Sequence, residues 1–458
     1  MNSPITVLKY IENNNPVQYI PACHIIERLQ ENGFAGYIAG GAVRDMVLKR
    51  KPNDVDILTN APLGKIRTIF ADQKVKKVGK LFPICIVNGI EVSSGRGELD
   101  KADFLKSDLA KRDFTMNAMA YDPVTKKIID PFNGKDDIKK RVIRFTDNPE
   151  KRIKEDPVRM IRACRFAAMI EGHISKKSLK AIIAAQDLLD GAVVTVAKER
   201  IGHEIIRAMA LSKPSLFFKA LKSSDLLSKI FPSLDRCYNL DGGPHHGETV
   251  FEHCMLVGDA ISPKYPILRL AGCLHDAGKF DAAITKHGDS GLPFLSFPGH
   301  EKHTKAIIQD LVKLKFSMKD IAYIKSLIKS HMRPLTHESK PKAVRRLLVM
   351  LDDYNLDYTD FMRMRIADKR GNLLKTPYTL SEIRIRLLKL FAEIAGNSPS
   401  RQEQLNITGD DIMEIFGIKS GPDIGRIKQI LFKKIVDDPE LNNYDELKKI
   451  CLLLKIEK

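Results

Sequence analysis

Residues 37–59 constrain the fold of this chain more than any other segment. A short apolar run, 37–39, leads into Gly40-Gly41, and residues 42–50 have a helical composition. Two adjacent glycines let the backbone turn tightly and approach a ligand closely. The pattern predicts a strand, a tight turn and a helix whose N-terminus is suited to bind a phosphate group.

Two aspartates follow this helix at a spacing of two. Asp54 and Asp56 alternate with apolar residues in segment 54–58, so we expect a strand with both carboxylates on one face. Carboxylate oxygens suit Mg²⁺, and a pair of such ions activates a hydroxyl and neutralises a triphosphate. Arg44, just inside the helix, is expected to contact the same phosphates. The alternative is an ordinary turn, two solvated aspartates and a surface pair between Arg44 and Asp45.

Two further residues are candidates for the same site. Arg112 precedes an apolar run and is a second candidate phosphate ligand, with a surface ion pair to Asp113 as the alternative. Glu91 lies in the strand-like segment 90–92 and is either a third metal-binding carboxylate or an exposed strand residue. Both alternatives stay open from the residues alone.

A second motif places an acidic residue beside an arginine at a predicted helix start. Pro157 and the acidic residues before it are typical of a helix N-terminus. Asp156 and Arg159, three apart, would present an acceptor beside a two-donor fork. Cytosine and adenine each show an amino donor next to a ring-nitrogen acceptor and fit this pair, whereas guanine and uracil do not. A weak surface ion pair between the two residues is the alternative.

Histidines and aspartates recur further downstream in an order typical of metal ligands. The residues in this order are His253, His275-Asp276, His300, His303, His331 and Asp368. Adjacent His and Asp residues offer two ligands to one metal, and neighbouring helices bring distant ligands alongside. Lone histidines in a helical domain are more often structural, so the order of the residues carries the hypothesis.

Strand signals are confined to the first third of the chain. The predicted strands are 36–39, 55–59, 84–87, 90–93 and 118–121. After the turn sequence 130–134, helical periodicity takes over, and everything downstream is predicted to be helical. Loop-forming segments place further domain boundaries near residues 240 and 375.

The charge balance favours a polyanionic partner. The 458 residues include 75 Lys and Arg against 57 Asp and Glu, a net charge of +18, and the basic residues are spread along the whole chain. A long basic surface of this kind suits RNA. The chain has neither an apolar run of membrane-spanning length nor a signal-peptide pattern, so we expect a cytoplasmic protein with no membrane partner. Its seven cysteines predict no disulfide framework.

Six motifs in order resemble the class II tRNA nucleotidyltransferase and bacterial poly(A) polymerase superfamily. They are GGAVRD, DVD, KRDFTMNAM, DPFNGKDD, EDPVRMIRACRF and KERIGHEI, between residues 40 and 205. The resemblance implies an α+β fold with a polymerase-β-like nucleotidyltransferase head, 20–135, and an all-α neck, 136–240, that selects the nucleotide. An HD-type metal-binding helical domain, 241–375, and a helical tRNA-binding tail, 376–458, follow. The reaction it implies is addition of C, C and A to the tRNA 3′ end from CTP and ATP.

The resemblance also implies roles for single residues. Asp54 and Asp56 are expected to be catalytic and to bind Mg²⁺. The expected nucleotide contacts are Gly41, Arg44, Arg112, Asp156, Arg159, Arg162 and Arg165. Residues 245–370 resemble HD-domain phosphohydrolases, which implies a transition metal or Mg²⁺ on His253, His275, Asp276 and Asp368. His300 and His331 are then expected at a second metal position, and the implied activity is a phosphatase or 2′,3′-cyclic phosphodiesterase acting on RNA ends.

Departures from the family pattern leave the product open. Lys49 replaces a usual glycine and Lys111 replaces the first arginine of an R-R-D triplet, and we expect neither to abolish the chemistry. Between Glu91 and Arg112 the chain lacks much of the arginine-containing loop of CCA-adding members, and CC-adding members have a shortened loop there. Addition of CC alone is therefore an alternative. Further alternatives are a poly(A) polymerase, an HD phosphohydrolase whose head only binds RNA, and a non-catalytic RNA-binding protein.

Overall fold

The computed structural model describes residues 16–79, 83–94, 104–190, 197–288, 291–396 and 401–456. The chain divides into two compact units, Met1–Ile230 and Phe231–Lys458. The first unit combines a sheet with helices and the second is mainly helical, so the predicted α+β class is confirmed. Within the described residues, every helix falls short of the length and apolar character that a bilayer crossing requires.

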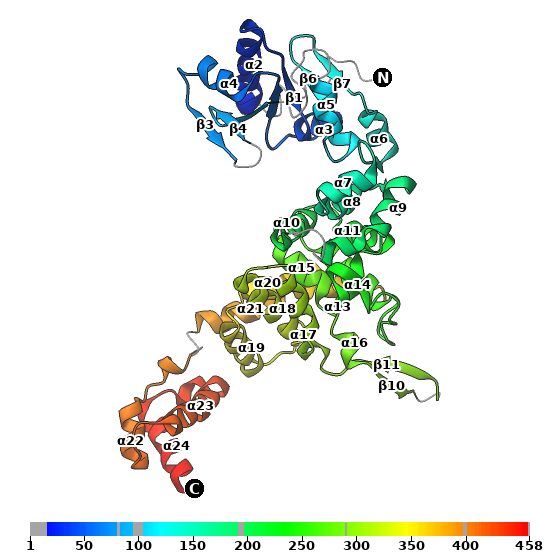
Figure 1. Ribbon diagram of the computed structural model, residues 1–458. Helices are drawn as coiled ribbons and strands as arrows, with labels where there is room; N and C mark the ends of the chain where they lie inside the picture. Colours follow the sequence, from blue (N-terminus) through cyan, green and yellow to red (C-terminus); the bar gives the residue numbers. More distant parts are fainter. Residues whose placement is uncertain are drawn as a thin grey trace. The chain divides into compact units, whose positions relative to one another are not determined.

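A seven-stranded sheet forms the first part of the first unit (Figure 1). Its strand order is β3-β4-β5-β2-β1-β6-β7, with β2 and β5 parallel and the other neighbours antiparallel. The strands are β1 (Gly36–Ala39), β2 (Asp56–Thr59), β3 (Val75–Val78), β4 (Ile84–Val87), β5 (Ile90–Ser94), β6 (Ala120–Asp122) and β7 (Lys127–Ile129). Sequence patterns predicted neither β3 nor β7. Both are edge strands that carry lysine, and an exposed edge need not show apolar alternation.

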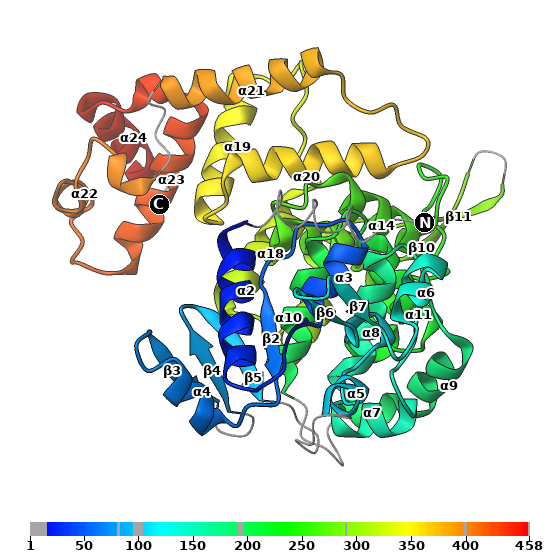
Figure 2. The ribbon, with the colours of Figure 1, turned by 90° about the horizontal axis from the view of Figure 1, so that it is seen from above.

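Helices cover both faces of this sheet. Helix α2 (Pro16–Glu31) packs on β1 and β2, and α4 (Leu63–Ile69) packs on β4 (Figure 2). On the opposite face, Ala39 of β1 and Leu58 of β2 share an apolar cluster with Phe104 of α5 (Phe104–Ala110). Because side chains alternate along a strand, Asp56 lies on the same face as Leu58.

The rest of the first unit is almost wholly helical. Its further elements are α3 (Gly41–Val47), η1 (Thr115–Asn117), α6 (Gly134–Lys140), β8 (Val142–Ile143), α7 (Pro149–Glu155), α8 (Val158–Met169), β9 (His173–Ile174), α9 (Lys176–Ala184), η2 (Gln186–Asp190), α10 (Lys198–Met209), α11 (Ser215–Ser223) and α12 (Leu227–Ile230). Helix α8 packs against both α10 and α11. Strands β8 and β9 correct the expectation that only helices follow residue 134. They are too short for their side chains to show an alternating pattern.

The second unit contains a helical bundle, a hairpin and a C-terminal helical cluster (Figure 1). Its elements are α13 (Pro232–Asp235), α14 (Val250–Ala260), α15 (Pro266–Leu274), α16 (Lys279–Ala282), β10 (Ile284–His287), β11 (Pro293–Ser296), η3 (His300–Lys302), α17 (Lys305–Lys313), α18 (Met318–Ser330), α19 (Pro341–Asp353), α20 (Tyr358–Gly371), α21 (Leu380–Ala395), η4 (Gln402–Gln404), α22 (Gly409–Phe416), α23 (Pro422–Asp437), η5 (Pro439–Leu441) and α24 (Tyr444–Ile456). Helices α14, α15, α18 and α20 pack against one another. The exposed β10–β11 hairpin was not predicted.

Candidate functional site

A cavity of about 1760 Å³ in the first unit gathers residues from distant parts of the sequence. It is lined by the head and neck residues that the sequence assigned to nucleotide or Mg²⁺ binding, but not by Glu91, the open candidate for a third carboxylate, which is exposed on β5. The assigned residues that line it are Gly41, Arg44, Asp54, Asp56, Arg112, Asp156, Arg159, Arg162 and Arg165. They come from the start of α3, the start of β2 and the residues before it, the segment before η1, the junction of α7 with α8, and α8 itself.

The glycine turn and Arg112 occupy one corner of this cavity. Gly40 has φ of +79°, a region that favours glycine, and caps the N-terminus of α3. A Cβ atom on Gly40 would lie only 2.2 Å from Nη1 of Arg112, so the arginine packs directly over the turn. Because β1 pairs Ala39 with Asp56, the turn lies next to the start of β2. Phosphate-binding and metal-binding groups are thereby neighbours.

The two aspartates reach the cavity differently. Strand β2 begins only at Asp56, so the prediction of a strand from Asp54 is wrong by two residues. The ladder between β1 and β2 ends at the pair Ala39–Asp56, because the chain turns at Gly40. Asp54 therefore has no residue of β1 opposite it. Asp54 is exposed and Asp56 is half-buried.

Burial and two other carboxylates affect the pKa of Asp56. Burial raises the pKa of Asp56 to about 6, the charges of Asp54 and Glu91 add to the rise, and Arg112 opposes it. Glu91 is close because the parallel register pairs Ile57 of β2 with Val92 of β5. A half-buried carboxylate whose pKa is raised beside two further acidic residues is suited to divalent cations.

Arg44 and Arg112 make contacts beyond the surface ion pairs that were the alternatives to phosphate binding. Arg44 does pair with Asp45 at 2.9 Å, but both side chains are 14% exposed and line the cavity, and Arg44 also donates to Asn117 Oδ1 at 2.9 Å. Arg112 pairs with Asp108 at 3.5 Å rather than with Asp113. Asp113 instead forms an ion pair with Arg162, whose Nη2 lies 2.9 Å from Oδ2.

Asp156 lies between α7 and α8, not within a helix. Asp156 and Arg159 do not form the ion pair that was the alternative, since each has a different charged partner. Arg200 of α10 donates two hydrogen bonds to Asp156, at 3.0 and 2.6 Å. Arg159 donates to Glu155 Oε2 at 3.0 Å and to the carbonyl of Arg152 at 2.9 Å. Both side chains are therefore oriented by their neighbours.

Glu204 of α10 lies among three arginines of the cavity. Its side chain is 8% exposed and lies 2.5 Å from Arg165 Nε, 3.7 Å from Arg162 Nε and 3.5 Å from Arg207 Nη1. Burial lowers the pKa of Arg165, and Glu204 opposes that shift. Sequence reasoning missed Arg200 and Glu204, although both belong to the motif KERIGHEI. Their spacing of four on an amphipathic helix was the available signal.

The predicted histidine cluster assembles in the second unit. His253 lies on α14, His275 and Asp276 follow α15, and Asp368 lies on α20. His253 Nε2 lies 3.2 Å from Asp368 Oδ1 and 3.7 Å from Asp276 Oδ2, and His275 Nε2 lies 3.4 Å from Asp276 Oδ1. His300 and His331 place Nε2 at 3.0 and 3.4 Å from Asp276 Oδ1.

The hydrogen bonds of the imidazole rings leave an acceptor-rich centre. The Nδ1 atoms of His275, His300 and His331 lie 2.8, 3.0 and 2.6 Å from backbone carbonyl oxygens, to which they donate. In the neutral rings Nε2 is then a lone-pair acceptor. His300 and His331 bring two such atoms to 3.3 Å, and buried Nε2 of His275 has no hydrogen-bond partner. Facing acceptors need a cation or an added proton, so this donor set fits a metal ion.

The pKa shifts of the cluster follow from burial and from these contacts. Burial lowers the pKa of His275 to about 3. Burial also lowers the pKa of His253, but its hydrogen bonds with Asp368 and Glu248 outweigh burial and raise the pKa to about 9. The pKa values of Asp276 and Asp368 are lowered despite burial, because the histidines stabilise the carboxylates.

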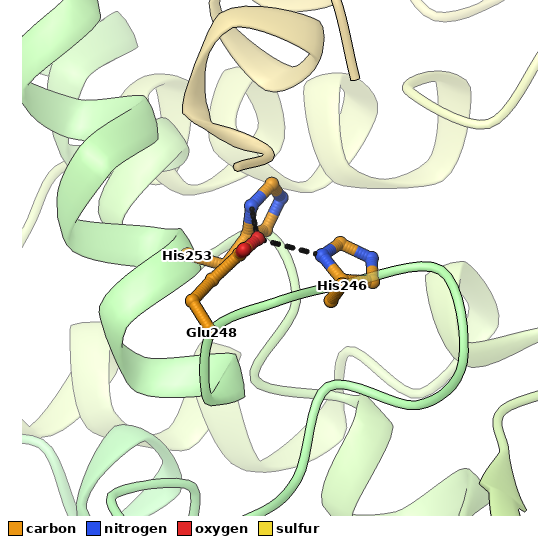
Figure 3. A group of neighbouring side chains, drawn as sticks. All are labelled: His246, Glu248 and His253. Atoms are coloured by element: carbon orange, nitrogen blue, oxygen red, sulfur yellow. Dashed lines mark hydrogen bonds and ion pairs between the residues drawn. The ribbon is translucent and has the colours of Figure 1, made fainter. Parts of the chain in front are cut away.

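Three groups of residues have ligand atoms within 4.8 Å of one another. They are His253 with His275 and Asp368, His275 with Asp276 and His331, and His246 with Glu248 and His253. The first two groups share His275 and would form neighbouring positions. The third group, shown in Figure 3, differs because both histidines direct Nδ1 at the Glu248 carboxylate.

Comparison with protein families finds two matching segments. Residues 36–144 match the family described as "Poly A polymerase head domain". Residues 173–238 match the family described as "Probable RNA and SrmB- binding site of polymerase A".

Several curated proteins are similar to this chain. A CC-adding tRNA nucleotidyltransferase of Halalkalibacterium halodurans is 40% identical over 189 residues, 40% of this chain and 47% of the relative. A poly(A) polymerase I of Salmonella typhimurium is 29% identical over 246 residues, 48% of this chain and 52% of the relative. The chain thus spans about half the length of these two relatives. A CCA-adding enzyme of Staphylococcus saprophyticus is 27% identical over 439 residues, 93% of this chain and 96% of the relative.

Among solved structures, the CCA-adding enzyme of Bacillus stearothermophilus in complex with CTP has the same fold. Its TM-score is 0.66 at 21% identity, and the match covers 100% of this chain and 99% of that chain.

Proposed function

The chain belongs to the class II tRNA nucleotidyltransferase and poly(A) polymerase superfamily, and we propose that it adds C and A nucleotides to the 3′ end of tRNA. The observation that carries the proposal is the cavity of the first unit. One cavity contains carboxylates suited to Mg²⁺, arginines suited to a triphosphate, and an acceptor–donor pair suited to a base. The relatives named as CC-adding and CCA-adding enzymes support the same reading.

In the proposed reaction, the 3′-hydroxyl of the RNA attacks the α-phosphorus and pyrophosphate leaves. Mg²⁺ ions bound by Asp54 and Asp56 would activate the hydroxyl and neutralise the phosphates. Arg44 and Arg112 bind the triphosphate beside the N-terminus of α3 and hold it in line for attack. The domain boundaries that we propose for this reaction remain a head at 20–135, a neck at 136–240, an HD-type domain at 241–375 and a tail at 376–458.

Base selection is assigned to Asp156 and Arg159. A carboxylate offers about four acceptor positions, and Asp156 uses two of them for Arg200 and one for the N–H of Val158 at 3.3 Å. Capacity for an amino hydrogen of cytosine or adenine therefore remains. Arg162 and Arg165, held by Asp113 and Glu204, complete the proposed nucleotide contacts.

A tRNA that lacks its 3′ end tests this function. It is incubated with CTP, with ATP and with both, and the products are separated at single-nucleotide resolution. We expect two additions with CTP, and a third with both nucleotides if the terminal A is added. The shortened loop that bears on the third addition includes residues 95–103, outside the described residues. Long A tails on unrelated RNA would favour the poly(A) polymerase, and no incorporation would reject nucleotidyl transfer.

A second activity is favoured by the histidine cluster, and we propose that it hydrolyses phosphate esters at RNA ends. His253, His275, Asp276 and Asp368 would hold one metal ion, and His300 and His331 would complete a second position. An RNA ending in a 2′,3′-cyclic phosphate is incubated with Mn²⁺, Co²⁺ or Ni²⁺.

Two variants separate the activities. Asp276→Ala should abolish hydrolysis and leave nucleotide addition intact, whereas Asp54→Ala should do the reverse. Wild-type protein that does not cleave the cyclic phosphate with any of the three metals would reject the hydrolase. If Asp54→Ala instead leaves all RNA-end activity intact, the head only binds RNA.

A further inference from the structure

Glu248 is an acidic residue beside the histidine cluster that none of the ligand motifs in the sequence contains. It lies in the loop before α14, its side chain is 1% exposed, and its carboxylate meets four N–H donors. Oε1 lies 2.8 Å from Nδ1 of His246 and 3.1 Å from Nδ1 of His253 (Figure 3). Nδ1 of His253 also hydrogen-bonds to the carbonyl oxygen of Gly371 at 3.2 Å, which favours a proton on the same nitrogen. Oε2 accepts from the backbone N–H of Gly247 at 3.0 Å and of Leu373 at 3.1 Å. All acceptor positions of the carboxylate are therefore in use.

The opposite nitrogen of each histidine shows what this arrangement achieves. Nε2 of His253 points toward Asp368 and Asp276, in the proposed metal position. Nε2 of His246 lies 3.2 Å from Nζ of Lys279, which pairs with Asp276 at 2.8 Å. A lysine ammonium only donates, so Nε2 of His246 accepts from Lys279 and the proton of the neutral ring lies on Nδ1. Nδ1 lies 2.8 Å from the Glu248 carboxylate, closer than its 3.1 Å contact with Nδ2 of Asn372. One carboxylate thus contacts two rings, of which His253 faces Asp276 directly and His246 faces Lys279, the partner of Asp276.

We propose that Glu248 is a positioning residue of the histidine cluster. It holds His246 and His253 with their protons on Nδ1, and thereby directs Nε2 of His253 to the metal and Nε2 of His246 to Lys279. A carboxylate behind a metal-binding imidazole fixes the ring and raises its basicity. The group formed by His246, Glu248 and His253 is accordingly a hydrogen-bonded support and not a third metal position. This inference rests on the proposed metal binding by the cluster.

Glu248→Gln is the sharpest test because it removes a charge at nearly constant shape. Backbone N–H groups can only donate, so the side-chain oxygen of the introduced glutamine accepts from the N–H groups of Gly247 and Leu373. The amide NH₂ then faces two Nδ1–H groups, and at least one ring must turn or move its proton to Nε2. A proton on Nε2 of His253 blocks the metal position. Outer partners of this kind typically contribute 10- to 100-fold in metal affinity, and we expect a loss of about that size.

The measurement is titration of the full-length protein with Co²⁺ alone, followed by its visible absorption and by calorimetry. His275→Ala defines the signal of the cluster. The matched control is Glu252→Gln. Glu252 is an exposed glutamate four residues after Glu248, and a glutamine can accept the same hydrogen bonds from Thr249. We expect weaker Co²⁺ binding in Glu248→Gln and wild-type binding in Glu252→Gln. Wild-type affinity in Glu248→Gln would overturn the positioning role.

A second measurement keeps the inference separate from the metal proposal and from folding of the variant. Ring ¹⁵N spectra of the wild-type protein report which nitrogen of His246 is protonated. Protonated Nδ1 supports the role of Glu248, and protonated Nε2 overturns it. If the wild type binds Co²⁺ no better than His275→Ala, the metal proposal fails, while the ring spectra still decide whether Glu248 orients His246.

Discussion

At the scale of single residues, the charge state of Asp56 is set by its burial and, to a smaller extent, by neighbouring acids. Its pKa of about 6 means that below this pH the carboxyl is protonated before a cation arrives. Mg²⁺ must then displace the proton, so the Mg²⁺ concentration for half-maximal CMP addition should rise about tenfold per pH unit below 6 and stay level above it. The assay is single-nucleotide addition between pH 5 and 8. A Mg²⁺ requirement that is level throughout would contradict the assignment.

A change at Asp156 should alter nucleotide choice more than it alters rate. Asp156→Asn replaces one acceptor oxygen by an NH₂ donor, and an amide that can flip no longer discriminates between an amino group and a carbonyl. We expect UMP and GMP incorporation to rise about 5- to 150-fold relative to CMP, the equivalent of about 1–3 kcal/mol. The matched control is Asp187→Asn, whose side chain is 84% exposed and bonds Lys229. Unchanged selectivity in Asp156→Asn would reject the template role.

The residues of the first cavity were predictable as a set, but their partners were not. Asp54, Arg44 and Arg159 belong to short motifs whose local chemistry is visible in the sequence. The partner of Asp156 is Arg200, forty-four positions later on another helix, and such a pair depends on how α8 and α10 pack. Glu248 was missed for a related reason, since its four donors come from three separate segments of the second unit.

At the scale of elements, the turn between β1 and α3 has no room for a side chain. Gly40→Ala forces a Cβ atom against Arg112 in a backbone conformation that costs other residues about 1–3 kcal/mol. We expect lower thermal stability and a fall of about 100-fold in kcat/KM for CTP, because the arginine is displaced from the phosphates. Gly64→Ala is the control, since a Cβ there meets nothing within 4 Å. This control variant should retain activity, and its free energy of unfolding should rise by at most about 1 kcal/mol. Equal behaviour of the two variants would contradict the role of the turn.

The interface of α8 with α10 depends on one buried carboxylate. Glu204→Ala leaves the guanidinium of Arg165 buried without its partner, and we expect a loss of about 3–5 kcal/mol in the stability of the first unit. The double variant Glu204→Leu with Arg165→Met removes both charges and should recover most of that loss. Thermal unfolding followed by circular dichroism distinguishes them. A double variant no more stable than Glu204→Ala would show that packing, not charge, causes the defect.

Element prediction succeeded where burial imposes a pattern and failed at edges. Strands β1, β4 and β5 are paired on at least one side with apolar neighbours, and their ranges were predicted to within a residue. Edge strand β3 reads as Val-Lys-Lys-Val and its solvent-facing lysines hide the period of two. The β10–β11 hairpin is largely exposed, so no apolar face marks it in the sequence.

At the scale of the whole molecule, the two proposed activities lie in different compact units. The nucleotide cavity is lined only by residues up to Leu211, and the histidine cluster begins at His246. A ligand stabilises the folded state of the unit that binds it by RT ln(1 + [L]/Kd), about 2.7 kcal/mol at a concentration of 100 Kd. We therefore expect calorimetry to resolve two transitions, of which CTP with Mg²⁺ raises one and Co²⁺ raises the other.

Matched variants assign the two transitions. Asp156→Ala should abolish the shift caused by CTP and keep the shift caused by Co²⁺, because it removes a base contact in the first unit alone. His275→Ala should abolish the shift caused by Co²⁺ and keep that caused by CTP, because it removes a ligand in the second unit alone. The units communicate if either variant abolishes both shifts, or if a single transition responds to both ligands, since stabilisation of one unit must then be transmitted through contacts to the other.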